Sequence, residues 1–367
     1  MKVAQFLEVS AIMVSVLVFS PTRGQAASWQ QAWSAQASAE YDSNPAMAPA
    51  YPVDIWRSIF EPGYKLKGTD GVNELNMGVA LQITRASNKM ISPNREDSRG
   101  FFDWRQRSNT DEFGISGAYD EVATRTTTID NTGPGLADST RTSRLLSANE
   151  NQALTERSTL ALDGAYEQVF YKGGTFVNYV TRSAGMKFSY AWNERNTPFL
   201  RISYTDYKPT NDGALSRLNN VLIGWNWKIS EYLECTIQAG KSRMDNVQGK
   251  QGGVNVQYTD QRTLVAINAD RQVSPSGFGG FVTVDQAKGS WSYALNESSK
   301  TGVDLEWQKN HLSMNVVNNT AGAWLQQDIN SSWGTRMYYL HKISMGGGAR
   351  AYSNILGVSL MYTPSDF

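Results

Sequence analysis

Eight short polar segments interrupt this chain and alternate with longer stretches rich in Gly, Asn and Pro. From Leu154 onward the short segments centre on Glu156, Glu194, Glu231, Asp260, Glu297 and Ser331, with spacings of 38, 37, 29, 37 and 34 residues, and two more lie upstream at Asp70-Gly71 and Thr110-Asp111. The longer stretches include Pro209 to Leu215 and Ser274 to Gly280. A strand, a long loop, a second strand and a tight turn make one repeating unit. This rhythm predicts an up-and-down transmembrane β-barrel with short periplasmic turns and long extracellular loops.

Between these segments, apolar and polar side chains alternate with the period of a strand. Val221, Ile223 and Trp225 share one face of such a segment, while Leu222, Gly224 and Asn226 share the other. The chain is therefore expected to be all-β, a single antiparallel barrel of about eighteen strands. The predicted strands are 29–41, 58–68, 74–86, 99–108, 112–122, 142–150, 158–170, 178–192, 198–207, 218–229, 232–243, 252–259, 262–271, 281–295, 301–308, 320–329, 332–343 and 353–363. Sixteen strands is the alternative, because 58–68 contains Pro62 and 142–150 alternates weakly.

The first residues have the pattern of a secretory signal. Lys2 supplies positive charge, Ala11 to Phe19 supply an apolar stretch, and Gly24-Gln25-Ala26 offers a small-x-small cleavage site. A membrane-anchoring helix is the alternative, but it needs about 20 apolar residues. We therefore predict a cleaved signal peptide over residues 1–27 and an outer-membrane barrel over 28–367. Acidic and basic side chains nearly balance, which gives no indication of nucleic-acid binding.

Composition agrees with a barrel that has a lipid-facing outside and a wet inside. Hydrophobic residues make up 40% of the chain and aromatic residues 11%, yet the mean hydropathy is −0.43. The lone Cys235 falls on the apolar side of its strand, where a small buried hydrophobe is expected. Aromatic residues close to the short turns are expected to form a girdle at the headgroup level: Trp192, Trp227, Tyr232, Tyr258, Tyr293 and Trp333.

Several phrases in the turns and strands carry a family resemblance. They are Tyr41-Asp42-Ser43-Asn44-Pro45, Asn73-Glu74-Leu75, Phe113 to Asp120 with Ala123 to Thr126, Asp138 to Thr142, Leu154 to Ser158, and Ser274 to Gly277. Together they resemble an uncharacterised family of proteobacterial outer-membrane β-barrel proteins associated with exopolysaccharide biosynthesis and with PEP-CTERM (exosortase) systems. The resemblance covers nearly the whole mature chain. It implies a role in exporting or handling an extracellular polysaccharide and supplies no active-site residues.

Residue patterns for catalysis are sparse. The two histidines, His311 and His341, are predicted in a loop and near the end of a strand, so a His-rich metal site is not expected. Gly240-Lys241-Ser242 resembles the end of a phosphate-binding loop, but Cys235 stands where the motif needs its first glycine. We predict no enzyme activity, cofactor or metal. A membrane-embedded enzyme that modifies lipid or glycan, using His311 or His341, is the least favoured alternative.

If the apolar faces point outward, a set of charged side chains points into the lumen. These are Asp103, Arg105, Arg107, Asp163, Glu167, Lys187, Arg201, Lys228, Glu234, Asp304 and Glu306. The basic members come mostly before residue 230 and acidic ones are richer afterward, so opposite walls are predicted to differ in sign. Charged side chains lining a pore select what passes, and salt bridges that only hold the wall in shape are the alternative. Phe101, Phe199 and Tyr338 on the polar faces are candidates for stacking on sugars.

The loops predicted at 42–57, 87–98 and 123–140 are candidate lids or plugs. Arg95, Glu96, Asp97 and Arg99 in the second of these could bind an anionic sugar or a lipopolysaccharide phosphate. The leading hypothesis is a monomeric outer-membrane barrel that gives a passive, hydrophilic route for an exopolysaccharide or oligosaccharide. Its expected partners are outer-membrane lipid and lipopolysaccharide, the glycan, periplasmic export components and the barrel-assembly machinery. A non-conducting scaffold or assembly factor for surface polysaccharide is the main alternative.

Overall fold

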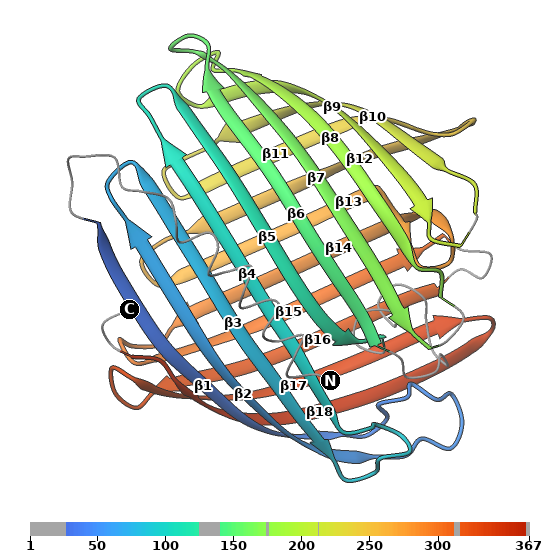
Figure 1. Cartoon of the computed structure of the whole chain (residues 1–367). Coiled ribbons are helices and arrows are strands. Elements are labelled where there is room, and N and C mark those ends of the chain that lie inside the picture. The colour runs from blue at the N-terminus through green and yellow to red at the C-terminus, as the bar shows by residue number, and fades with distance from the viewer. Residues whose placement is uncertain (1–26, 125–139, 174–175, 212, 312–315, 365–367) are drawn as a thin grey trace.

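The computed structural model describes residues 27–124, 140–173, 176–211, 213–311 and 316–364, and their strands form one closed antiparallel sheet (Figure 1). The eighteen strands in these ranges are β1 (Ser28–Asp42), β2 (Ile55–Thr69), β3 (Asn73–Ala86), β4 (Arg95–Arg107), β5 (Asp111–Ala123), β6 (Thr140–Ala153), β7 (Ser158–Lys172), β8 (Tyr179–Tyr190), β9 (Asn196–Pro209), β10 (Ser216–Lys228), β11 (Leu233–Met244), β12 (Val247–Thr259), β13 (Thr263–Ser276), β14 (Gly280–Ala294), β15 (Ser299–Asn310), β16 (Val316–Asp328), β17 (Trp333–Gly346) and β18 (Ala349–Tyr362). The eighteen-stranded prediction is confirmed, and each predicted strand overlaps one of these. Strand β2 runs through Pro62, and β6 is continuous.

The sheet closes because β1 pairs with β2 on one side and with β18 on the other. Ala39 lies opposite Ser58 in one register and opposite Val358 in the other. Each strand from β2 to β17 pairs with its two neighbours in the chain. A closed sheet satisfies its backbone groups without exposing an edge, which is the condition for a β-structure to cross lipid.

All eight predicted short turns are present, and they share one local structure. At Asp260, a carboxylate oxygen accepts the backbone N–H groups of Arg262 and Thr263 at 2.8 and 2.6 Å. The Asp260 N–H in turn donates to the Thr263 carbonyl. The same Asp, Asn, Ser or Thr bond to the backbone recurs at the equivalent first positions, Asp70, Ser108, Thr155, Asn193, Ser230, Asn296 and Asn330. Side chains of this kind favour tight turns because they replace a backbone hydrogen bond.

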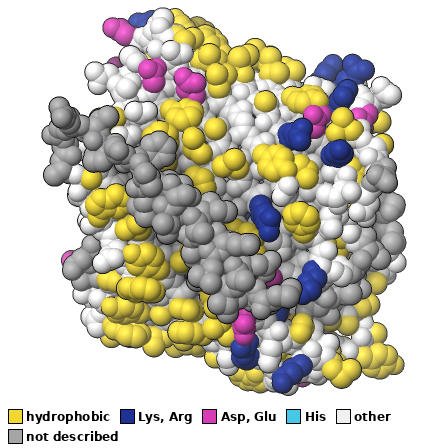
Figure 2. Space-filling view, viewed as in Figure 1, with side chains coloured by type: hydrophobic (Ala, Val, Ile, Leu, Met, Phe, Trp, Pro, Cys, Tyr) yellow, Lys and Arg dark blue, Asp and Glu magenta, His cyan; other side chains and the backbone are white. Residues whose placement is uncertain are grey.

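The outer face of the barrel is apolar, as the alternation predicts. In β18, outward Leu356, Val358 and Leu360 are exposed, while Ser359 between them is buried. Exposed Trp192, Trp227, Tyr232 and Trp333 lie beside the short turns, where the girdle was expected. Figure 2 shows the hydrophobic side chains spread over the outer surface. Cys235 is buried, also as predicted.

The opposite end of the barrel differs from the prediction. Several loops expected to be long are tight, because β11 and β12 are separated only by residues 245–246, and β17 and β18 only by 347–348. Ser274 belongs to β13 rather than to a loop. Arg95, Glu96 and Asp97, predicted in a loop, begin β4 and continue into Arg99. Polar residues that continue a strand beyond the apolar band look like a loop in sequence, which explains these errors.

Other predictions fall on residues that cannot be compared. The signal peptide, except for Ala27, and most of the loop predicted at 123–140 lie outside the described residues. The described part of the chain contains no helix that is long and apolar enough to cross a membrane.

Candidate functional site: the inner wall of the barrel

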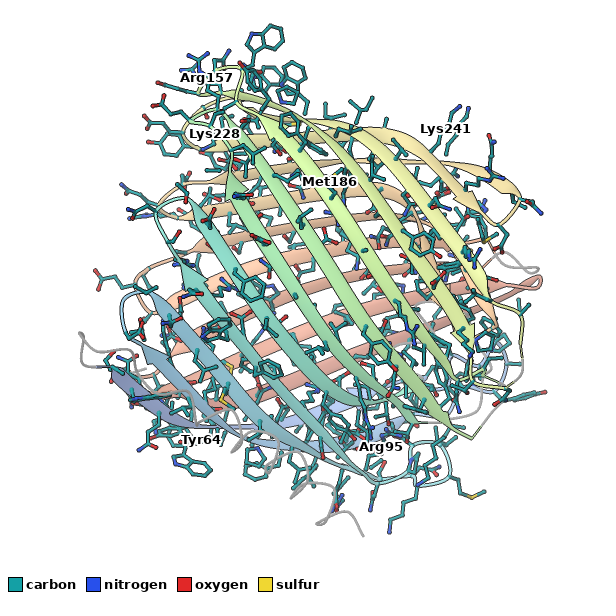
Figure 3. The ribbon with its side chains drawn as sticks, turned by 45° about the horizontal axis from the view of Figure 1, so that its top comes forward. Tyr64, Arg95, Arg157, Met186, Lys228 and Lys241 are labelled. Carbon is teal, nitrogen blue, oxygen red and sulfur yellow. The ribbon has the colours of Figure 1, made fainter. Side chains whose placement is uncertain are left out.

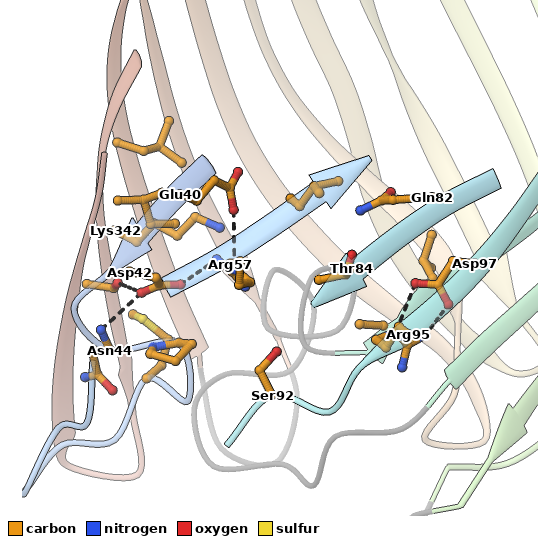
Figure 4. A pocket seen from close by; sticks show the side chains of 18 of the residues that line it. Glu40, Asp42, Asn44, Arg57, Gln82, Thr84, Ser92, Arg95, Asp97 and Lys342 are labelled. Atoms are coloured by element: carbon orange, nitrogen blue, oxygen red, sulfur yellow. Dashed lines mark hydrogen bonds and ion pairs between the residues drawn. The ribbon is translucent and has the colours of Figure 1, made fainter. Parts of the chain in front are cut away.

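The inner face is identified by a cavity of about 440 Å³ inside the barrel (Figure 4). Its lining includes Glu40, Asp42, Arg57, Arg95 and Asp97, which come from β1, β2 and β4. Residues paired across neighbouring strands share a face, so the registers extend this inner face around the whole wall. All eleven predicted lumen residues lie on it: Asp103, Arg105, Arg107, Asp163, Glu167, Lys187, Arg201, Lys228, Glu234, Asp304 and Glu306.

On β7 to β9, an ion pair crosses an intervening strand. The guanidinium Nη2 of Arg201 donates to both carboxylate oxygens of Asp163, at 2.9 and 3.1 Å. Gly185 of β8 lies between the two strands, and a Cβ there would come within 2.5 Å of the carboxylate. The pair therefore depends on a glycine at this position. Lys187 lies opposite Arg201, and its ammonium sits 4.3 Å from the centroid of the Phe199 ring.

Around β4, cations and carboxylates alternate along the same wall. Arg105 pairs with Asp103 at 2.8 Å, and Arg107 pairs with Glu112 at 3.2 Å. Arg99 lies 3.2 Å from Asp120 of β5. Each positive side chain is thus matched by a neighbour on its own or an adjacent strand.

The later strands follow the same rule. Lys288 Nζ lies 2.7 Å from Glu306, and Lys228 Nζ lies 3.8 Å from Glu234. Asp304 accepts the indole N–H of Trp324 at 3.0 Å. The prediction that opposite walls differ in sign is therefore wrong. Lys288 was not among the predicted lumen residues, and it supplies a cation on the wall that was expected to be acidic. Oppositely charged side chains on neighbouring strands lie close enough to pair.

Of the charged side chains around the cavity at the loop end, Arg95, Asp97 and Arg99 were candidates from the sequence, whereas the cluster of Glu40, Asp42 and Arg57 was missed. Arg57 Nη2 lies 2.8 Å from Asp42, and Arg57 Nε lies 3.3 Å from Glu40. Asp42 also accepts the hydroxyl of Ser353 at 2.5 Å and the backbone N–H of Asn44 at 3.1 Å, which draws the loop after β1 against the wall (Figure 4). The signal was present, since Glu40 and Asp42 continue the polar positions of β1. Glu40, however, lies at the end of a predicted strand, and Asp42 lies at the start of a predicted loop.

A second overlooked feature is a groove lined by amide side chains on the inner face of β11 to β14. It has a volume of about 270 Å³. Asn255 lies directly opposite Asn268 in the register, and Gln286 Nε2 donates to Asp270 at 2.8 Å. Its polar side chains are Thr236, Gln238, Asn255, Asn268, Asp270, Gln272 and Gln286. Asp270 is the one charged residue of that lining, so the pattern of charges in the sequence does not indicate the groove.

Aromatic residues join two distant parts of the wall at the loop end. Tyr179 of β8 stacks on Tyr207 of β9 with ring centroids 4.8 Å apart, and both are buried. The end of the β13–β14 hairpin packs on them, with Phe281 5.7 Å from Tyr207 and the Tyr207 hydroxyl donating to the Ser276 carbonyl at 3.0 Å. We call Tyr179, Tyr207, Phe281 and Ser276 the aromatic bridge. Because the two tyrosines are on the inner face, the hairpin end leans across the mouth of the barrel.

Of the aromatic residues proposed for sugar stacking, all three lie on the inner face but differ in access. Phe101 is 41% exposed, whereas Phe199 is 6% exposed and is covered by Lys187. The Tyr338 hydroxyl donates to Glu40, beside the charged cavity. Among the described residues, no group of three or more His, Cys, Asp and Glu side chains could hold a metal ion.

Comparisons with known proteins place the fold. No protein-family profile matches the chain, and no curated protein sequence matches it significantly. The solved structure of Pseudomonas aeruginosa OccK2 (OpdF) is similar with a TM-score of 0.51 at 9% identity, covering 91% of this chain and 98% of that chain. OpdK from Pseudomonas aeruginosa has a TM-score of 0.50 at 12% identity, covering 91% and 98%. A BenF-like porin from Pseudomonas fluorescens Pf-5 has a TM-score of 0.50 at 8% identity, covering 91% and 99%. At these identities the likeness establishes a shared barrel fold.

Proposed function

We propose that this chain is an outer-membrane barrel that gives a passive, hydrophilic route for a polysaccharide or oligosaccharide. The observation that carries the proposal is the closed sheet of eighteen described strands with an apolar outside and a polar inside. Barrels of about 16–18 strands are too wide for side chains of the wall to fill and leave an aqueous channel. No cofactor is needed, because the solute moves down a gradient or is pushed from the periplasm.

The chemistry of the wall favours a neutral, hydroxyl-rich solute. Several cations and carboxylates of the wall are paired, such as Arg201 with Asp163 and Lys288 with Glu306, which weakens the net field there. The amide groove offers groups that both donate and accept hydrogen bonds, as sugar hydroxyls do. OccK2 has been solved in complex with glucuronate, an anionic sugar, and the hydroxyl groups of such a molecule, not its charge, are what the amide groove would match. The exopolysaccharide association of the family that the sequence resembles points in the same direction.

Conductance in planar lipid bilayers tests the route itself. The purified barrel should give stable current steps in KCl with little preference between K⁺ and Cl⁻, because the wall charges are matched. Protein that inserts, shown by heat-modifiable gel migration, but passes no current would refute the channel.

A matched pair of variants tests the glycan preference. Asn255→Leu with Asn268→Leu removes the central amides of the groove, and Asn149→Leu with Asn151→Leu makes the same chemical change on the inner face of β6. The groove variant should slow maltohexaose flux into vesicles severalfold while KCl conductance stays nearly unchanged. Equal slowing by both variants would argue against a glycan groove.

One observation favours the scaffold alternative. The aromatic bridge narrows the mouth between β7–β9 and β13–β14. If the barrel were a non-conducting scaffold for surface polysaccharide, Tyr207→Ala would leave the membrane without current, whereas a channel should conduct more when the bridge is cut. The two readings are therefore separated by the same recording.

A further inference from the structure

Three basic side chains crowd the outer face of one tight hairpin. Lys241 of β11 lies directly opposite Lys250 of β12, and Arg243 follows two residues along on the same face. All three are exposed. Lys241 extends from the outer edge of the barrel in Figure 3. We call Lys241, Arg243 and Lys250 the outer cationic patch.

Among the described residues, no carboxylate forms an ion pair of 4.0 Å or less with Lys241, Arg243 or Lys250 of the patch. Asp245, next along the turn, accepts a hydrogen bond from Arg243 Nε through its backbone carbonyl at 3.2 Å, while its carboxylate accepts the backbone N–H of Arg217. Like charges directly opposite on neighbouring strands are destabilising. Elsewhere on the same outer face cations do have partners, since Arg271 pairs with Asp285 at 2.5 Å and Arg217 lies 3.7 Å from Asp206.

The patch also lies at a particular height on the barrel. Tyr232 marks the girdle at the short-turn end of β11, and Lys241 is nine residues further along the chain. With about 3.4 Å per residue and a strand tilt of roughly 40°, this separation is about 23 Å along the barrel axis. The apolar band of such barrels is about 25 Å tall. The outer cationic patch therefore sits where the hydrocarbon ends and the headgroups of the second leaflet begin.

Apolar side chains lie directly below the patch on the same face. Ile237 on β11 and Val254 on β12 are paired across the hairpin, and both are exposed. A molecule that fits this surface carries phosphate at one end and acyl chains at the other. A free small anion would use the cations only, whereas a phospholipid-like molecule would use both parts.

We propose that the outer cationic patch binds the phosphate groups of lipid A, the phosphorylated glycolipid of the outer leaflet, with its acyl chains on Ile237 and Val254. This inference rests on the proposed outer-membrane location, with the β11–β12 turn at the cell surface. Two lysines and an arginine within one hairpin supply charge-assisted hydrogen bonds to phosphate oxygens. The lipid thereby relieves the repulsion between Lys241 and Lys250.

Lipid A binding to the purified full-length barrel in neutral detergent tests the proposal, measured by native mass spectrometry at low salt. The test variant is Lys241→Gln with Arg243→Gln and Lys250→Gln. The control is Lys65→Gln with Lys67→Gln and Lys300→Gln, which removes the same charge from the inner face. The test variant should bind bisphosphorylated lipid A at least tenfold more weakly, and the control should match the wild type.

Two further arms decide what is recognised. The wild type should bind dephosphorylated lipid A only weakly. Its affinity for that lipid should equal the affinity of the test variant for bisphosphorylated lipid A. Inorganic phosphate alone should compete only at far higher concentration. Equal affinity for both lipids, undiminished binding by the test variant, or displacement by inorganic phosphate at lipid-like concentrations would each overturn the proposal.

Current recordings on the same samples keep this proposal separate from the channel. A wild-type protein that conducts but binds phosphorylated and dephosphorylated lipid A equally well would refute only the lipid site. Protein that binds lipid A through the patch but passes no current refutes only the channel.

Discussion

Replacing Arg201 with Gln would leave the Asp163 carboxylate unpaired on the inner wall. In the unmodified chain the guanidinium holds both carboxylate oxygens, so a passing ion meets an almost neutral pair. Both side chains are 38% exposed, and an exposed ion pair contributes at most about 1 kcal/mol to stability. The variant should therefore fold, and the change in charge should appear in ion selectivity.

The size of the effect follows from the Coulomb energy. A unit charge about 7 Å from a hydrated ion contributes about 0.6 kcal/mol in water. A Debye length of about 10 Å in 0.1 M salt reduces this to about 0.3 kcal/mol. Cations are then favoured by about 1.7-fold and anions disfavoured by the same factor, since RT is about 0.6 kcal/mol. The ratio of K⁺ to Cl⁻ permeability should rise about threefold.

Reversal potentials across a KCl gradient in planar bilayers measure this ratio. Asp163→Asn leaves Arg201 unpaired and should shift the ratio in the opposite direction by a similar factor. Both shifts should nearly vanish at 1 M salt, where the Debye length is about 3 Å. Shifts of the same sign in the two variants, or no shift while both still conduct, would show that this pair does not face the ion path.

Three other changes test further parts of the structure through stability and folding. Tyr207→Ala removes a fully buried ring, and truncation of a large buried aromatic side chain typically costs about 3–5 kcal/mol of stability. The thermal unfolding midpoint on heat-modifiable gels should therefore fall. An unchanged midpoint would mean that the aromatic bridge is not formed. Gly185→Leu should lower the same midpoint, because its Cβ would meet the Asp163 carboxylate at 2.5 Å, and the control Gly289→Leu, where nothing lies within 4 Å of the Cβ, should not. The backbone N–H groups of Arg262 and Thr263 hold the pKa of Asp260 below its usual value. Because the folded-state pKa is lower than the unfolded value of about 3.9, the ionised Asp260 side chain stabilises the fold at pH values above about 4. The folding yield of the unmodified chain in lipid vesicles should therefore exceed that of Asp260→Ala at pH 7, and this advantage should disappear as the pH falls below about 4. A pH-independent difference would contradict the assigned hydrogen bond.

The strands were predictable because each one separates lipid from water. On β10, Val221, Ile223 and Trp225 face outward and Asn226 faces inward, so the period of two is strong in the sequence. The short turns were predictable for a different reason. A residue such as Asp260 or Asn330 can accept two backbone N–H groups, and this chemistry is local to four residues.

The loop end was less predictable because polarity there has two causes. Arg95 and Asp97 are polar because they face the lumen within a strand, whereas a loop residue is polar because it faces water. A single sequence does not separate these cases. The hairpin end at Ser276 was expected to be a loop, and its position against Tyr207 depends on contacts between strands that are far apart in the sequence.

The inner wall was predicted by face but not by pairing. The alternation of polar and apolar residues placed Asp163, Lys187 and Arg201 on the inward face of their strands. The strand registers place all three on that face. Which carboxylate meets which cation depends on strand register, and on a small residue such as Gly185 that leaves space. The amide groove could not be predicted without the strand pairing, because β11 to β14 together bring its neutral side chains to one place.

Cysteine accessibility along β12 tests the central claim most directly, in a Cys235→Ala background and in a lipid bilayer. Asn255→Cys and Gln257→Cys should react with a charged, membrane-impermeant methanethiosulfonate, and the current should fall as they do. Val254→Cys and Val256→Cys should stay unmodified, because lipid covers them. Reaction at all four positions alike, or modification of the inner positions without any change in current, would contradict a water-filled barrel with alternating faces.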